Sequence, residues 1–185
     1  MKIKAFLFVT LFAFGFLIAN AQTFDKGTKV LNLGIGLGGN YYSTWSGSSH
    51  TPLLAASFDV SILDGVLDKG SIGVGGYFGY QSAKYDYSGG YGWKQTSMLI
   101  GPRGTFHYPF IDKLDTYAGL LLGYHIVKWT YTGNWGGINQ DNGASSVYFS
   151  GFIGARYYFT NNIGAYLELG SGSLGLANIG IAIKF

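Results

Sequence analysis

Apolar side chains alternate with small or polar ones along most of the chain beyond residue 21. A period of two residues is that of a β-strand, whose successive side chains point to opposite faces of a sheet. Turn-like stretches separate the alternating segments, and the chain has only three prolines. The pattern predicts eight strands of about ten residues each. They span residues 28–39, 53–62, 71–81, 95–108, 116–130, 146–159, 163–171 and 176–185.

Charged residues within these strands all fall on the same face as the small and polar residues. Strand ends and the segment 116–130, whose phase is ambiguous, are left out of this comparison. The charges that remain are Asp59, Arg103, Arg156, Glu168 and Lys184. A soluble sheet would carry many Lys and Glu on its solvent face, yet charged residues are 11% of this chain against about 25% in typical domains. The pattern favours a barrel with a crowded polar interior and an exterior that faces lipid.

The N-terminus has the three-part layout of a secretory signal peptide. Met1–Lys4 is short and basic, residues 5–19 are almost entirely apolar, and Ala19-Asn20-Ala21 is an A-x-A cleavage site. The apolar run is short for a membrane-spanning helix, and a retained anchor helix is the alternative. We therefore predict a signal peptide at residues 1–21 and one barrel domain at residues 22–185.

Composition excludes several classes of site and partner. Loss of Lys2 and Lys4 with the signal peptide lowers the formal net charge from +3 to +1, and the chain has no cysteine. Such a charge gives no footprint for nucleic acid, and the missing thiols exclude disulfides and a lipoprotein anchor. Three isolated histidines lack the spacing of metal ligands. We predict no metal, no cofactor and no nucleic-acid partner.

Gly34, Gly36 and Gly39 match the G-x-G-x-x-G fingerprint of dinucleotide-binding turns. That fingerprint needs a helix after the glycines to hold the pyrophosphate, whereas loop-like residues, "NYYSTWSGSSHTP", follow Gly39. Gly34 and Gly36 instead alternate with Leu33, Ile35 and Leu37. We interpret the glycines as inward positions of a strand that leave room for large neighbours such as Tyr77 or Tyr166.

The connections between strands alternate in length. Residues 40–52, 82–94 and 131–145 are long and rich in Tyr, Trp, Gly, Ser and Asn, and residues 172–175 lie at the same end. The intervening connections, residues 63–70, 109–115 and 161–162, are shorter. All the tryptophans (Trp45, Trp93, Trp129, Trp135) lie at the long-loop end, and Tyr108, Tyr158, Phe159 and Phe185 at the short-turn end. Long loops at one end, short turns at the other and two aromatic girdles are typical of outer-membrane barrels.

Four segments carry a resemblance to a known family. They are "MLIGPRGTFHYPF" (98–110), "KLDTYAGLLLGYHI" (113–126), "GARYYFTNNIGAYLELG" (154–170) and the terminal "ANIGIAIKF" (177–185). The chain resembles the small outer-membrane β-barrel proteins of Bacteroidetes-type bacteria, which are related to the opacity-protein, OmpX-like and OmpA barrel-domain families. Pro102 departs from the family pattern, and because proline lacks a ladder donor we expect a bulge there.

The resemblance implies an all-β fold, namely a transmembrane, eight-stranded, antiparallel up-and-down β-barrel in a Gram-negative outer membrane. It implies outer-membrane lipid and lipopolysaccharide as partners and a monomeric state. It also implies that Phe185, at the end of the last strand, is the signal that the barrel-assembly machinery reads during insertion.

The interior charges suggest a structural role. We predict that Asp59, Arg103, Arg156 and Glu168 form a salt-bridge network, because buried charges need partners. An eight-stranded barrel has an interior just wide enough for side chains, so we expect closure rather than conduction. A narrow channel is the alternative.

Two histidines leave open a lipid-modifying enzyme, an acyl hydrolase or transferase. Ser150 could approach His125 as nucleophile and base, but Ile126 and Val127 follow His125 and no H-x-S motif is present. His107 lies near the short-turn end. We expect no enzyme, since no catalytic constellation is assembled.

The long connections have the composition of adaptable binding surfaces. Their aromatic residues are candidate contacts: Tyr41, Tyr42, Trp45, Tyr85, Tyr87, Tyr91, Trp93 and Trp135. We predict a structural or adhesin-like role on the cell surface, with extracellular proteins or glycans as ligands of the loops. A soluble periplasmic barrel remains a further alternative.

Overall fold

The computed structural model describes residues 24–38, 48–87, 91–132, 142–170 and 174–185. The predicted signal peptide at residues 1–21 lies outside them and stays a prediction. Among the described residues, no helix is long and apolar enough to cross a membrane.

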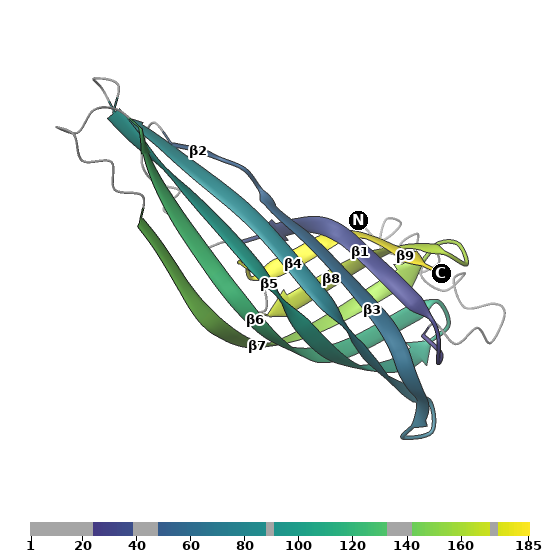
Figure 1. Cartoon of the computed structure of the whole chain (residues 1–185). Coiled ribbons are helices and arrows are strands. Elements are labelled where there is room, and N and C mark those ends of the chain that lie inside the picture. The colour runs from purple at the N-terminus through teal and green to yellow at the C-terminus, as the bar shows by residue number, and fades with distance from the viewer. Residues whose placement is uncertain (1–23, 39–47, 88–90, 133–141, 171–173) are drawn as a thin grey trace, which may run out of the picture.

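The described chain is an antiparallel β-sheet, which confirms the all-β prediction (Figure 1). Its nine strands are β1 (Lys29–Leu37), β2 (Ser48–His50), β3 (Leu53–Val66), β4 (Gly70–Tyr87), β5 (Tyr91–Ile111), β6 (Leu114–Thr132), β7 (Asn142–Tyr158), β8 (Ile163–Gly170) and β9 (Ala177–Lys184). Eight of them overlap the predicted segments. The ninth, the three-residue β2, pairs with β4 and lies within the predicted connection 40–52.

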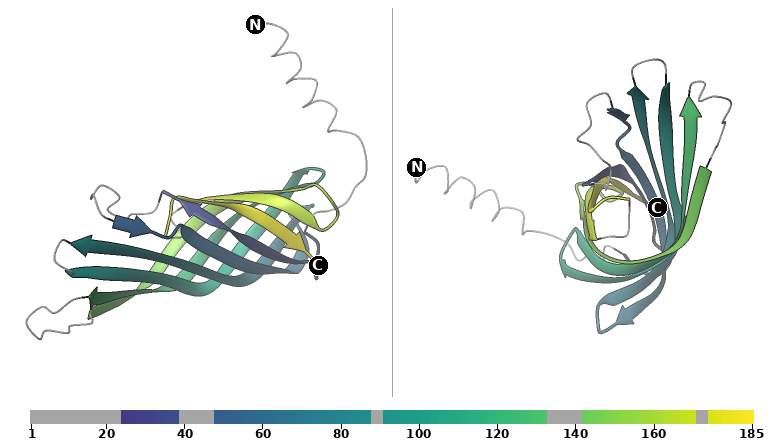
Figure 2. Two further views of the ribbon diagram at one scale, coloured as in Figure 1. Left: turned by 90° about the horizontal axis from the view of Figure 1, so that it is seen from above. Right: turned by 90° about the vertical axis from the view of Figure 1, so that its left-hand side faces the viewer.

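The pairings lead around a ring. The sheet order is β2-β4-β3-β1-β9-β8-β7-β6-β5, and an additional pairing joins β4 to β5. The first and last of the long strands, β1 and β9, are antiparallel neighbours. Seen end-on, the ribbon curls into a ring from which several strands project (Figure 2). Each of the eight long strands therefore has strand neighbours on both sides.

Strands β4 to β7 extend well beyond β1, β8 and β9 at the long-loop end (Figure 1). They have 18, 21, 19 and 17 residues, against 8 each in β8 and β9. We call the projecting part, residues 82–87 of β4, 91–97 of β5, 125–132 of β6 and 142–148 of β7, the extended sheet.

The extended sheet corrects the prediction that residues 82–94 form a long connection. β4 and β5 pair without a register shift from Ser71 and His107 to Tyr87 and Tyr91. The turn-like Ser, Gly and Asp content of the segment concealed this hairpin. Tyrosine and tryptophan favour strands, and residues at alternate positions of the hairpin pack on one face.

The bulge expected at Pro102 is absent. Pairing of β5 with β6 has the same register at Ile100–Tyr124 and at Arg103–Leu121. Only the two intervening positions are unpaired on that side, so the missing proline donor interrupts the ladder without inserting a residue. The irregularities of the sheet lie near the short-turn end instead, between Tyr108 and Ile111 on β5 and beyond Ser61 on β3.

Inward and outward faces follow the predicted alternation. On β3, Leu54, Phe58 and Ile62 point outward and are 41–50% exposed, whereas Asp59 and Ser61 are buried. The ambiguous segment 116–130 takes a defined phase. Tyr117 and Leu121 are buried, and the outward side chains of that strand are Leu120, Leu122 and Tyr124.

One residue of the predicted aromatic girdle at the short-turn end points the other way. Tyr158 is 2% exposed and lies inside the ring, where the Lys184 ammonium is 4.7 Å from its ring centroid. Its neighbour Tyr157 is 42% exposed and lies on the outward face with Phe159. Tyr158 shares the inward face with Arg156, two residues earlier.

Inward glycines permit close packing, as the sequence suggested. A Cβ atom at Gly34 would lie 2.5 Å from the Tyr166 hydroxyl oxygen and 2.3 Å from the backbone oxygen of Ile179, and one at Gly36 would meet Leu53. At the outward Gly104 the same atom would meet nothing within 4 Å.

Gly34→Ala should therefore destabilise the protein by about 1–3 kcal/mol, because the backbone of β9 cannot withdraw from the added methyl group. Gly104→Ala is the matched control, with an expected change between zero and a gain of about 1 kcal/mol. Urea-induced unfolding measures both, and equal effects at the two positions would contradict the inward placement of Gly34.

Candidate functional site

The interior of the ring contains a network of buried charges. Arg103 on β5 lies between Asp59 on β3 and Glu168 on β8. Its guanidinium donates from Nη2 to Glu168 Oε1 at 2.7 Å and to Asp59 Oδ2 at 3.2 Å. The Nε atom is 2.9 Å from Asp59 Oδ1. The two atoms are close enough to form an ion pair, but their geometry is not that of a hydrogen bond. All three residues are at most 5% exposed.

Arg156 on β7 extends the network towards the short-turn end. Its Nη2 contacts Asp59 Oδ2, its Nη1 donates to Asp115 Oδ2 at 2.9 Å, and its Nε donates to Asn32 Oδ1 at 3.1 Å. Arg156 is fully buried. Asp59 therefore bridges both arginines, and the structure brings together the four interior charges singled out in the sequence.

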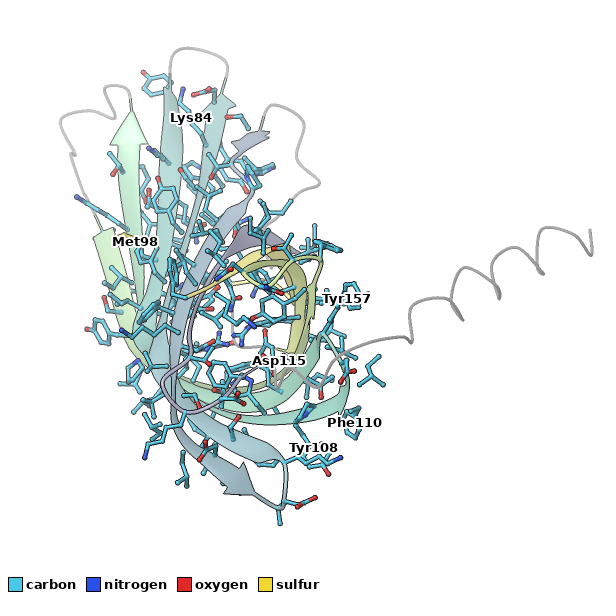
Figure 3. The ribbon with its side chains drawn as sticks, turned by 90° about the vertical axis from the view of Figure 1, so that its right-hand side faces the viewer. Lys84, Met98, Tyr108, Phe110, Asp115 and Tyr157 are labelled. Atoms are coloured by element: carbon cyan, nitrogen blue, oxygen red, sulfur yellow. The ribbon has the colours of Figure 1, made fainter. Side chains whose placement is uncertain are left out.

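Asp115 and His107 complete the network and were not predicted as members. His107 Nδ1 is 2.8 Å from Asp115 Oδ1, and His107 Nε2 is 2.8 Å from Thr105 Oγ1. Asp115 was assigned to a short turn, but β6 begins at Leu114. Extending the alternation back from Tyr117 would have placed Asp115 on the inward face. Figure 3 shows Asp115 pointing into the ring.

Aromatic rings fill the space around the two guanidinium groups. The Arg156 Cζ atom lies 4.3 Å from the Tyr117 ring centroid, and Arg103 Cζ lies 4.4 Å from that of Phe152. Tyr117 also donates its hydroxyl to Glu168 Oε1 at 2.8 Å. Rings at these distances attract cations through their quadrupole, so the desolvated arginines gain partners on the sides that no carboxylate reaches.

Phe24 closes the short-turn end of this interior. Its ring is 2% exposed and stacks on His107 with centroids 3.8 Å apart. The Ser71 hydroxyl donates to the Phe24 carbonyl at 2.7 Å, which fixes the chain before β1. Beside it, partial burial and the Asp64 carboxylate raise the pKa of Asp25, while Lys184 opposes the shift. Phe24 precedes the first alternating segment, so periodicity gave no signal for it.

The hollow beside the network is small. The hollow beside Tyr77, Arg103, Glu168 and Asn178 has a volume of about 10 Å³. That is room for about one water molecule. In the part of the chain that the structure describes, this packing does not favour the narrow-channel alternative.

Half of the predicted loop contacts lie outside the described residues, and half lie in strands. Tyr41, Tyr42, Trp45 and Trp135 belong to the first group. Tyr85 and Tyr87 are in β4, and Tyr91 and Trp93 are in β5, so the prediction that these four belong to a loop is wrong. Phe185 continues β9 and exchanges backbone hydrogen bonds with Lys29 at the start of β1.

Three strands of the extended sheet contribute to an aromatic stack on its inner face. Tyr85 and Trp93 are directly paired across β4 and β5, and their rings are 4.1 Å apart with 19° between planes. Trp129 on β6 lies 4.8 Å from Trp93. His50 on β2 meets Tyr85 edge-on at 6.1 Å. Trp129 was noted only as a girdle residue, because its partners were assigned to a loop.

The nucleophile and base suggested for an enzyme are not adjacent. His125 pairs across the strands with Ser146, and Ser150 pairs with Leu121. Ser150 thus lies four residues further along β7, a displacement of about 13 Å. Asp115, His107 and Thr105 do have the hydrogen-bond order of a carboxylate, base and hydroxyl relay, but Phe24 covers the imidazole of His107.

No group of three or more His, Cys, Asp or Glu side chains within the described ranges is arranged to hold a metal ion. Gly34 and Gly36 lie in the middle of β1, where Ile179 and Leu53 pack against them. Extended backbone therefore runs through the first two glycines of the fingerprint as far as Leu37, and Gly39 lies outside the described residues.

The protein resembles known proteins in its fold and not in its sequence. No family model matches the chain, and no curated protein matches it. One similar solved structure is that of Ail, the attachment invasion locus protein of Yersinia pestis, in complex with the heparin analogue sucrose octasulfate. It superimposes on this chain with a TM-score of 0.54 at 12% sequence identity. That match covers 86% of this chain and 99% of Ail.

The likeness establishes the fold. A second structure of Ail gives a TM-score of 0.52 at 13% identity over the same shares of both chains. The N-terminal β-barrel domain of Pseudomonas aeruginosa OprF matches with a TM-score of 0.47 at 16% identity, over 87% of this chain and 98% of that domain. The chain therefore has the architecture of the Ail barrel, which agrees with the OmpX-like resemblance and leaves the Bacteroidetes assignment a prediction.

Arg156→Met should destabilise the protein by about 3–5 kcal/mol, because Asp59 and Asp115 would lose the cation between them while remaining buried. The exposed Lys94→Met is the control, with an expected change within about 0.5 kcal/mol. Urea-induced unfolding followed by tryptophan fluorescence measures both. A loss below about 1 kcal/mol for Arg156→Met would contradict the role of the ion pairs.

Proposed function

We propose that this protein is an outer-membrane, eight-stranded closed β-barrel that interacts with extracellular ligands through its extended sheet. The short-turn end faces the periplasm and the extended sheet faces the cell exterior. The filled interior supports a structural barrel rather than a pore. The extended sheet, with its aromatic stack held above the barrel, is the observation that carries the proposed interaction.

An apolar belt around the outside supports membrane insertion. All eight strands of the ring contribute outward side chains that remain about half exposed, and they include Leu33, Ile35, Leu54, Val74, Ile100, Leu120, Leu122, Ile153, Leu167, Leu169 and Ile179. Surfaces of this extent are uncommon on soluble monomers. Burial of the charged side chains inside and exposure of apolar ones outside is the arrangement that lipid favours.

Three lysines lie on the outer face of the extended sheet, above this belt. Lys84 and Lys94 are directly paired across β4 and β5, and Lys128 pairs with Thr96, two residues from Lys94. Lys84 forms an exposed ion pair with Asp86 at 3.0 Å. The remaining positive charge fits the phosphate groups of lipopolysaccharide in the outer leaflet, which we include among the partners.

Two further features support a binding surface. Among the described residues, β7 pairs with β8 only from Phe152 to Tyr158. The outer half of β7 is therefore an edge of the described sheet, and exposed edges can accept a strand from a partner. Ail, whose fold this chain shares, is an attachment protein that binds a heparin analogue. We extend that surface role, with a protein or glycan ligand, to this chain.

Insertion can be tested on β1. Ile35→Lys should lower the free energy of unfolding in lipid vesicles by up to about 2–4 kcal/mol, since a lysine on the lipid face must be desolvated. Ile35→Leu, the control, should be neutral. Loss of heat-modifiable gel migration for the lysine variant alone would agree with insertion. A fully soluble wild-type protein after fractionation of cells would contradict it and favour the periplasmic barrel.

Surface interaction can be tested on whole cells. Cells that display the protein should adhere to heparin-coated surfaces and to host-cell monolayers, and Trp129→Ala should reduce this adhesion several-fold by removing one end of the stack. Phe110→Ala, at the other end of the barrel, should leave adhesion unchanged at equal surface levels. Adhesion that survives both Trp129→Ala and deletion of residues 133–141 would contradict the proposal.

The relay of Asp115, His107 and Thr105 favours a second candidate, a lipid-modifying enzyme. If Phe24 is the barrier to substrate, Phe24→Ala should hydrolyse phospholipid in mixed micelles, and a second change, Thr105→Val, should abolish that turnover. Adding His125→Ala to Phe24→Ala distinguishes the two histidines, because turnover that depends on the relay of His107 should survive the loss of His125. Our first proposal predicts no turnover in any of these variants.

A further inference from the structure

A hollow of about 430 Å³ lies on the outward face of the sheet near the short-turn end. One wall is formed by Phe106, Tyr108 and Phe110 of β5, and the opposite wall includes Leu167 and Leu169 of β8. Figure 3 shows Tyr108 and Phe110 outside the ring, away from the interior into which Asp115 points. The volume of the hollow is within the range of small-molecule sites, about 300–1,000 Å³.

Strand register explains why the surface is hollowed here. The pairings place Tyr108, Thr116, Ala155 and Leu167 in one row across four strands. Large side chains therefore stand at the two ends of the row and small ones between them. In the next row Ala118 lies beside Phe106, and the larger Ile153 stands between Ala118 and Leu169. The short side chains of the floor are thus those of Thr116, Ala118 and Ala155, and the two walls are apolar except for the Tyr108 hydroxyl.

The hairpin that continues the β5 wall carries one charge of each sign. Asp112 and Lys113 form the turn between β5 and β6, and both are exposed. Within the described ranges neither side chain takes part in an ion pair. The Lys113 backbone oxygen accepts a hydrogen bond from Tyr158, which holds the turn against β7. The turn after β7, Thr160-Asn161-Asn162, carries no charge.

We propose that this hollow binds one acyl chain of a zwitterionic phospholipid of the phosphatidylethanolamine class, with the head group on the β5–β6 turn. The phosphate pairs with Lys113 and the ammonium with Asp112, so the turn complements a neutral head group better than an anionic one. The hollow lies in the apolar belt, where acyl chains are the solvent. The inference rests on the proposed insertion in a membrane.

The experiment is native mass spectrometry of the full mature chain, released from detergent micelles doped with equal amounts of phosphatidylethanolamine and phosphatidylglycerol. We expect one retained phosphatidylethanolamine per chain, at about tenfold over phosphatidylglycerol. Ala155→Leu fills the floor and should lower retention of both lipids about tenfold. Asp112→Asn should remove the preference between them and leave acyl-chain binding, because the ammonium that distinguishes the two head groups would lose its partner.

Matched controls are Ala56→Leu, an outward alanine on β3, and Asp68→Asn, an exposed aspartate in the turn between β3 and β4, and both should retain lipid as wild type does. Ala118→Leu provides a second filled floor. Equal retention of the two lipids, unchanged retention in both filled variants, or a dimer in place of the lipid adduct would overturn the inference. Heat-modifiable migration, measured in parallel, separates this failure from a failure of membrane insertion.

Discussion

Two buried arginines set the condition that the rest of the structure must meet. Arg103 and Arg156 are enclosed by a ring of strands, so their charges are stable only if carboxylates and aromatic rings reach them from every side. Asp59 bridges both, while Glu168 accepts from Arg103 and Asp115 accepts from Arg156. These residues come from β3, β5, β6, β7 and β8, so the network can form only when most of the ring is in register.

The same condition links the interior to the surface. With the charged groups paired inside, the outward positions of each strand are free to be apolar. Small inward residues such as Gly34 let large neighbours such as Tyr166 approach, and Phe24 fills the short-turn end. At the other end β4 to β7 continue past the barrel. Their inner face no longer encloses charges and carries the stack of Tyr85, Trp93 and Trp129 instead.

The sequence was sufficient for the parts of the fold where a single period governs the pattern. Placement of Asp59, Arg103, Arg156 and Glu168 on one face followed from alternation alone. Asp115 was missed because it was placed in the connection 109–115, before a strand whose phase was ambiguous, with three consecutive leucines at residues 120–122. The hairpin at Tyr85 and Trp93 was missed because turn-like composition outweighed strand propensity, and β pairing is a property of two segments together. Phe24 lies outside any periodic segment, and only the closed ring shows what it covers.

The proposed fold requires that successive side chains of each strand alternate between a lipid-facing exterior and a filled interior. Single introduced cysteines can report this alternation one position at a time, because the chain has no cysteine of its own. Cysteines at residues 54, 56 and 58, labelled with a fluorophore and refolded in vesicles, should be quenched by brominated acyl chains. Unlabelled cysteines at residues 55 and 57 should resist both water-soluble and membrane-soluble maleimides until the protein is unfolded. Quenching without this alternation, or rapid reaction of residues 55 and 57 with the water-soluble reagent, would contradict the account.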